Sequence, residues 1–173
     1  MSLQYNVSTL LKEPVGSTRE YEIEGRALVN EDDPETRDVA GQVTFLRTNE
    51  GILVSAEVRG VELDKCSRCL KEIDIPVSLA FEEMFYPMSD ISTGARVPKP
   101  VDLDAFRLSE RWILDLEEPI RQFWTVALPM QPLCRTDCRG LCPQCGQDWN
   151  EGECECAPNA DERWSALRTL LRK

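Results

Sequence analysis

The chain has 173 residues, 42% of them apolar, and carries 31 acidic against 20 basic residues, a formal net charge of −11. This composition is typical of a soluble globular protein and argues against nucleic-acid binding by the whole surface, because phosphate affinity depends on Lys and Arg. The absence of histidine excludes Ser-His-Asp and Cys-His catalysis, so an enzyme is not expected.

The first 130 residues are predicted to form a β-rich domain. Apolar residues alternate in residues 3–7 and 19–23, which predicts two strands. Residues 31–38 are mostly charged and are expected to form a surface loop. The clearest alternation covers residues 39–81 in three runs, the second ending at Gly60, and predicts an antiparallel meander.

A helix is predicted over residues 115–128, packed on this sheet. Acidic residues precede the apolar ones and Pro119 lies in the first turn, and both features favour a helix start. The apolar face would consist of Leu116, Ile120, Phe123, Trp124 and Ala127. The expected fold class is therefore α+β, an antiparallel sheet with a packed helix over residues 1–130.

Six of the eight cysteines lie from residue 134 onward, which predicts a metal site. They are Cys134, Cys138, Cys142, Cys145, Cys154 and Cys156. Cys142 and Cys145 are the firmest pair, because two thiolates two residues apart can grip one ion from a tight turn. Tetrahedral zinc takes four ligands, so one structural zinc ion is expected, and two of the six cysteines would be spare. The sequence does not say which two.

Prolines 129 and 132 mark the expected boundary to a cysteine-rich module, residues 131–173. A module of this size is too small to hold itself without metal, and a zinc knuckle or ribbon is the expected form. Residues 160–173 have a helical pattern and are predicted to form a terminal helix with a basic end.

The alternative to zinc is a disulfide framework, since the number of cysteines is even. The opening residues Met1–Asn6 do not resemble a signal peptide, and no stretch of the chain is apolar enough to cross a membrane, so a cytoplasmic protein is expected. The cysteines are also confined to one end and one further pair, whereas a stapled scaffold distributes them through the chain. Structural zinc is therefore the favoured hypothesis.

The further pair, Cys66 and Cys69, lies at a bend between two predicted strands. Its spacing suits half a zinc site or a redox pair, and the neighbouring cations Lys65 and Lys71 would lower a thiol pKa. Packing as two small apolar side chains is an equally good interpretation. The sequence also leaves open whether this pair approaches the C-terminal module and completes its metal site.

Three segments carry a resemblance to a known family. One is Cys66 to Leu70 with the alternating strand after it, and another is the helical segment 115–128 leading into a proline. The most specific runs from Pro132 to Gly146 and continues to Asn150-Glu151-Gly152. In these segments the chain resembles the bacterial and plastid YceD family, also called the large ribosomal RNA subunit accumulation protein family.

The resemblance implies a non-enzymatic factor in biogenesis of the large ribosomal subunit that supports accumulation or processing of 23S ribosomal RNA. It implies no catalytic residue and no small-molecule substrate. The expected partners are large-subunit precursors, ribosomal proteins or 23S ribosomal RNA, the last through a local patch that includes Arg135 and Arg139. Zinc would then be a structural elaboration.

Two other functions compete with this one. A thiol oxidoreductase would use Cys66 and Cys69, but such a pair usually lies in a βαβ setting, and here it lies between predicted antiparallel strands. A zinc-ribbon module that binds nucleic acid in transcription would need a basic surface, and this chain is acidic.

Overall fold

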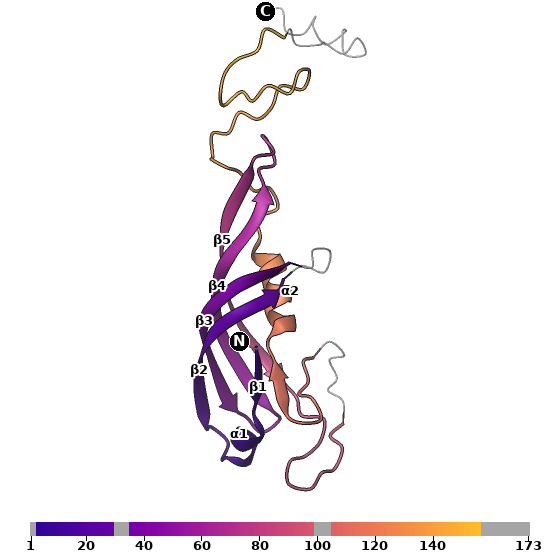
Figure 1. Cartoon of the computed structure of the whole chain (residues 1–173). Helices are drawn as coiled ribbons and strands as arrows, with labels where there is room; N and C mark the ends of the chain where they lie inside the picture. The colour runs from indigo at the N-terminus through magenta and orange to yellow at the C-terminus, as the bar shows by residue number, and fades with distance from the viewer. Residues whose placement is uncertain (1–2, 30–34, 99–104, 157–173) are drawn as a thin grey trace, which may run out of the picture. The chain divides into compact units, whose positions relative to one another are not determined.

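The computed structural model describes residues 3–29, 35–98 and 105–156, which form two compact units (Figure 1). The sheet unit consists of the described residues up to Asp64 and of those in Ile73–Pro132. The cysteine unit consists of Lys65–Glu72 and the described residues from Leu133 onward. It therefore includes a segment that the sequence-based boundary at residue 131 assigned to the sheet domain. The predicted terminal helix, residues 160–173, lies outside the described residues.

The sheet unit is built on a four-stranded antiparallel sheet whose strands neighbour one another in chain order. The strands are β2 (Thr18–Leu28), β3 (Thr36–Arg47), β4 (Ile52–Lys65) and β5 (Glu72–Phe85). This arrangement confirms the predicted meander. The loop expected over residues 31–38 ends earlier than predicted, because β3 begins at Thr36, which pairs with Leu28 of β2.

A second, two-stranded antiparallel sheet pairs β1 (Gln4–Asn6) with β6 (Ile113–Asp115). The short helix α1 (Ser8–Lys12) follows β1 and buries Leu10 and Leu11 in the core. This small sheet brings the start of the chain next to the segment that leads into the second helix.

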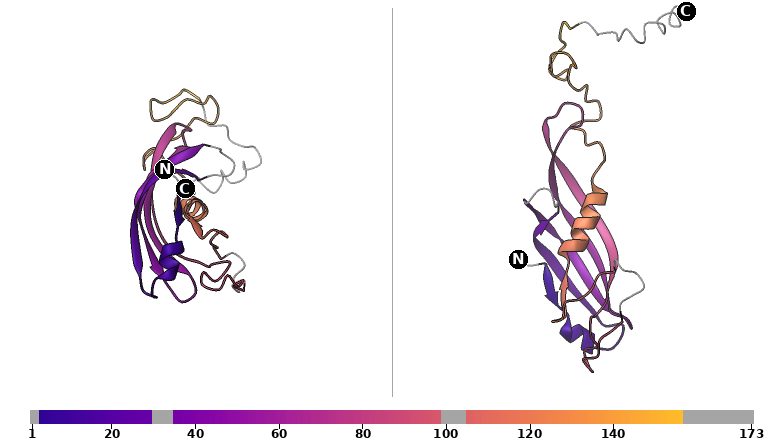
Figure 2. Two further views of the ribbon diagram at one scale, coloured as in Figure 1. Left: turned by 60° about the horizontal axis from the view of Figure 1, so that its bottom comes forward. Right: turned by 90° about the vertical axis from the view of Figure 1, so that its right-hand side faces the viewer.

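Helix α2 (Glu117–Ala127) lies along one face of the four-stranded sheet (Figure 2). It buries Ile120 and Trp124, and the half-buried Phe123 stacks on Phe81 of β5 with ring centroids 4.9 Å apart. The predicted apolar face is therefore correct except for Ala127, which is exposed at the last residue of the helix. No helix in the described part of the chain is long and apolar enough to cross a membrane.

Strand β4 does not end at Gly60 as the sequence predicted but continues for five residues, to Lys65. Beyond Gly60 the inward position is taken by Glu62, which is only 8% exposed. One of its carboxylate oxygens accepts a hydrogen bond from Arg37 Nε at 3.0 Å, and the other accepts one from the Trp124 indole at 2.9 Å. A buried carboxylate satisfied in this way allows the strand to continue past the end of its apolar pattern.

Candidate metal centres

All eight cysteines of the chain gather into two groups of four with free thiols. In each group the sulfur atoms lie within 4.8 Å of one another. The hairpin cluster consists of Cys66, Cys69, Cys134 and Cys138. The C-terminal cluster consists of Cys142, Cys145, Cys154 and Cys156. Both groups belong to the cysteine unit, and the first joins the connection between β4 and β5 to the C-terminal part of the chain.

The structure places the six predicted metal ligands in these groups but does not bring them together as one set. Cys134 and Cys138 lie with Cys66 and Cys69, while the other four predicted ligands form a group of their own. One ion with two spare cysteines does not describe this arrangement. Only the six C-terminal cysteines were predicted as ligands, because the sequence left the role of Cys66 and Cys69 open.

The two Cys-x-x-Cys segments adopt the same turn. In each, the first cysteine donates its backbone N–H to the carbonyl five residues later at 2.8 Å, and its own carbonyl accepts from the N–H four residues later at 2.9 Å. The residue after the second cysteine has a positive φ in both turns, 60° at Leu70 and 74° at Gly146. The turn at Cys66 therefore has the backbone of a zinc knuckle, like the turn at Cys142. The Cys-x-x-Cys spacing had already suggested half a zinc site at Cys66 and Cys69, and the shared backbone of the two turns agrees with that interpretation.

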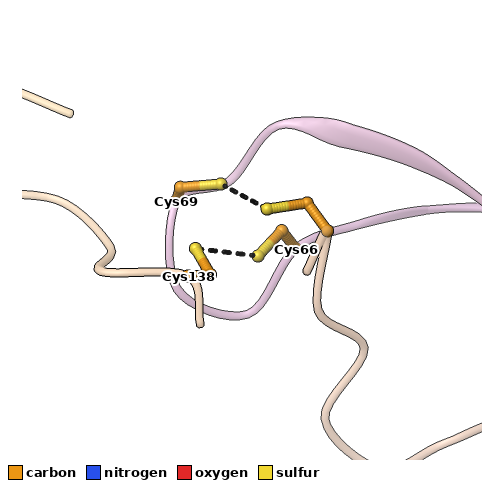
Figure 3. Close-up of side chains that lie close together, drawn as sticks. Cys66, Cys69 and Cys138 are labelled. Carbon is orange, nitrogen blue, oxygen red and sulfur yellow. Dashed lines mark hydrogen bonds between the residues drawn. The ribbon is translucent and has the colours of Figure 1, made fainter. Parts of the chain in front are cut away.

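The sulfur positions of the hairpin cluster suit a tetrahedral ion. The sulfurs of Cys66 and Cys138 are 3.8 Å apart, and those of Cys69 and Cys134 are 3.6 Å apart, with the labelled side chains turned toward one another (Figure 3). Four sulfurs around zinc at about 2.3 Å lie about 3.8 Å from one another. A disulfide requires an S–S distance of about 2.0 Å. The cluster thus fits a tetrathiolate shell.

Hydrogen bonds stabilise the thiolate form of at least one cysteine in each cluster. A backbone hydrogen bond from Cys69 lowers the pKa of Cys66 to about 6. The indole of Trp149, 3.5 Å from the sulfur, lowers the pKa of Cys154 to about 6. Burial instead raises the pKa of Cys134 to about 12. The thiolate is the form that binds a metal, so each cluster already favours this form at one or more of its sulfurs.

Cysteines also supply the buried side chains of the cysteine unit. Among its described residues, the buried ones are Cys66, Cys69, Cys138, Gly140 and Cys142. The hydrophobic core cluster of the protein contains no residue from this part of the structure. With no residue in that core, the described part of the unit is expected to depend on a metal held by its sulfur clusters for stability.

The same geometry disfavours thiol exchange at Cys66 and Cys69. A redox-active thiol combines a low pKa with access to solvent. The pKa of Cys66 is low, but the residue is 0% exposed and its sulfur faces Cys138. Cys69, the other thiol that such an exchange would use, is only 4% exposed. Both thiols therefore lie where metal ligands of a closed site would, and not where a redox-active thiol would.

The basic side chains proposed as a local patch are engaged within the unit. Arg135 donates to the Asn150 side chain at 2.7 Å, and Arg139 donates to Glu153 at 2.8 Å. An RNA phosphate would have to compete with these partners, so the described part of the unit offers less positive charge than its sequence indicates.

Substitutions at Leu70 and Gly146, the two turn positions with a positive φ, should change metal affinity in opposite directions. Leu70→Gly is expected to strengthen metal binding several-fold and Gly146→Ala to weaken it, because an L side chain in the left-handed region costs about 1–2 kcal/mol. Competition with a chromophoric zinc chelator measures both effects. Leu70→Ala is the matched control, since Leu70 is 61% exposed and this change keeps the strained backbone. Equal effects of Leu70→Gly and Leu70→Ala would show that the backbone angle is not the cause.

Comparison with known proteins finds a family and several relatives. The family model described as large ribosomal RNA subunit accumulation protein YceD matches residues 54–171, a range that includes both clusters. Uncharacterized proteins of Mycobacterium tuberculosis and Mycobacterium bovis are 35% identical over 124 residues, covering 71% of this chain and 57% of theirs. One of Mycobacterium leprae is 31% identical over 124 residues, with 71% and 54% covered. The chain thus spans a little over half the length of these relatives. No solved structure matches it.

Proposed function

Because the chain belongs to the YceD family of large ribosomal RNA subunit accumulation proteins, we propose that it supports accumulation of 23S ribosomal RNA during assembly of the large ribosomal subunit. The observation that carries this proposal is the family match over residues 54–171, which covers β4 from Val54 on, β5, α2 and both cysteine clusters. In this role the protein works in the cytoplasm, where bacterial ribosomes assemble, and binds large-subunit precursors.

The proposed action is binding without catalysis. The chain has no histidine, and its eight thiols are grouped as two possible ligand sets. An all-thiolate shell around zinc is typical of structural sites, whereas catalytic zinc keeps an open position for water or substrate. Neither a small-molecule substrate nor a catalytic residue is therefore part of the proposal.

Zinc is proposed as the structural metal of the cysteine unit, held by the cysteines of the two clusters in the manner of a zinc knuckle or ribbon. The thiolate donors and the sulfur spacings of 3.6 and 3.8 Å support this choice. The metal would give a fixed shape to the cysteine unit, whose described residues contribute nothing to the hydrophobic core cluster. Such a segment can serve as a separate contact module, residues 131–173 with the turn at Cys66.

The acidic charge of the chain points to basic protein partners. Glutamates 20, 22 and 24 lie exposed along β2, and the net charge is −11. Ribosomal proteins are mostly basic, and complementary charge steers such partners together. Contact with ribosomal proteins on the precursor is therefore proposed ahead of direct contact with 23S ribosomal RNA.

Sedimentation of the tagged full-length chain through sucrose gradients at low and moderate salt tests this function. We expect co-migration with large-subunit precursors, and we expect depletion of the protein to lower the ratio of 23S to 16S ribosomal RNA. A chain lacking residues 133–173 is expected to keep the sheet unit folded but to remain near the top of the gradient. Recovery of the full-length chain only at the top at both salts, with an unchanged RNA ratio, would refute the proposal.

A further inference from the structure

One turn of the chain touches both cysteine clusters. It is the Asp148–Glu151 turn, closed by hydrogen bonds from the N–H groups of Glu151 and Gly152 to the Asp148 carbonyl at 3.0 and 3.2 Å. Asn150 Nδ2 lies 3.4 Å from the sulfur of Cys138 in the hairpin cluster. The neighbouring Trp149 donates its indole N–H to the sulfur of Cys154 in the C-terminal cluster at 3.5 Å. Adjacent residues thus donate to sulfurs of different clusters.

The orientation of the Asn150 amide is fixed by its surroundings. Its Oδ1 accepts from the backbone N–H of Arg139 at 2.8 Å and from the Arg135 guanidinium at 2.7 Å. With the oxygen occupied by two donors, the amide nitrogen is the atom that faces Cys138. Asn150 therefore acts as a positioning residue for the hairpin cluster, in the way that outer hydrogen bonds orient metal ligands.

An ion pair holds the same turn to the other side of the hairpin cluster. Lys71 Nζ lies 3.0 Å from Asp148 Oδ2 and 2.7 Å from Glu151 Oε1. The carbonyl of Lys71 also accepts the N–H of Cys66, which closes the knuckle around that cysteine. The turn is thus attached to the segments on both sides of the cluster, the one with Cys66 and the one with Cys138.

The two clusters differ in how much chain they must bring together. The ligands of the C-terminal cluster flank the Asp148–Glu151 turn within a single stretch of sequence. The hairpin cluster pairs Cys69 with Cys134, 65 residues later in the chain. An ion in the C-terminal cluster would fix both ends of the turn. Asn150, Asp148 and Glu151 would then already be placed for the hairpin cluster, and less ordering would remain when a second ion binds there.

We propose that the chain binds two Zn²⁺ ions, one in each cluster, and that the Asp148–Glu151 turn couples them so that either ion raises the affinity for the other. The coupling is reciprocal, because linkage requires the same factor in both directions. This inference rests on the zinc binding proposed above but not on the ribosomal role.

The test uses the full-length chain under reducing conditions with Zn²⁺ as the probe. Native mass spectrometry is expected to find two ions per chain, and one in each of the double variants Cys142→Ser/Cys145→Ser and Cys66→Ser/Cys69→Ser. Competition with a chromophoric chelator should show the remaining cluster weakened about 10- to 100-fold in both double variants, the range found for lost outer contacts. Circular dichroism of each full-length variant checks that the strands of the sheet unit are still folded.

The variant Asn150→Ala tests the contribution of the turn to the coupling without removing a metal ligand. It is expected to keep two ions but to show a reduced coupling factor, whereas Thr136→Ala, at an exposed position between two ligands of the hairpin cluster, should behave like the unmodified chain. One ion per unmodified chain would overturn the two-ion assignment, and equal affinities with and without the other cluster would overturn the coupling. Full coupling in Asn150→Ala would show that the turn does not carry it. Absence of bound zinc would instead refute the proposed metal.

Discussion

Removal of bound zinc from the full-length chain is expected to unfold the cysteine unit and leave the sheet unit folded. The buried side chains in the described part of the cysteine unit are all cysteines, so the energy that holds it is expected to come from the bonds to the proposed zinc. Structural zinc contributes about 10–16 kcal/mol of apparent free energy in small zinc modules. The sheet unit has its own core of apolar residues, which includes Phe45, Phe85 and Trp124.

Hydrogen exchange with mass spectrometry, before and after treatment with a zinc chelator, measures this difference. Amides in residues 65–72 and 133–156 should lose protection, while those in β3 and β4 keep theirs up to Asp64. Adding Zn²⁺ back should restore protection, and Mg²⁺ should not, because it prefers oxygen ligands. If the cysteine unit stays protected after metal loss has been verified, its stability has another source.

The sheet and its helix could be predicted because their signals are local. Period-two alternation in β3 and β4 and the one-sided apolar pattern of α2 each follow from a single element facing one core. The predicted end of β4 at Gly60 was wrong because the inward apolar positions stop there while the strand continues to Lys65. Glu62 takes an inward position, and only the fold supplies its partners Arg37 and Trp124.

The grouping of the cysteines could not be predicted, because it depends on contacts between distant parts of the chain. Cys66 and Cys138 are separated by 72 positions, and no local pattern relates them. The sequence showed that the C-terminal part of the chain has enough cysteines for a metal site. It did not show that four of them form a complete group without a cysteine from another part of the chain. The partners of Arg135 and Arg139 were hidden for the same reason, since Asn150 and Glu153 reach them only in the folded unit.

Replacement of Trp124 by alanine is expected to lower the free energy of unfolding of the sheet unit by about 3–5 kcal/mol. Trp124 is 1% exposed and holds α2 to the sheet in two ways. Its ring covers Gly60, where even one added carbon would lie 2.6 Å from Cη2, and its indole donates to Glu62. Alanine leaves a cavity above Gly60 and removes one hydrogen bond from a buried carboxylate, and both effects destabilise the unit.

Urea unfolding of the zinc-loaded chain, followed by circular dichroism, measures this loss. Val126→Ala is the matched control in the same helix, because Val126 is 82% exposed and its truncation should change stability by no more than about 0.5 kcal/mol. A second variant, Glu62→Gln, keeps an acceptor for the indole but removes the charge that Arg37 pairs with. Its cost should fall between the other two, because the cavity term is absent. If Trp124→Ala costs no more than Val126→Ala, the ring does not anchor α2, and the continuation of β4 past Gly60 needs another cause.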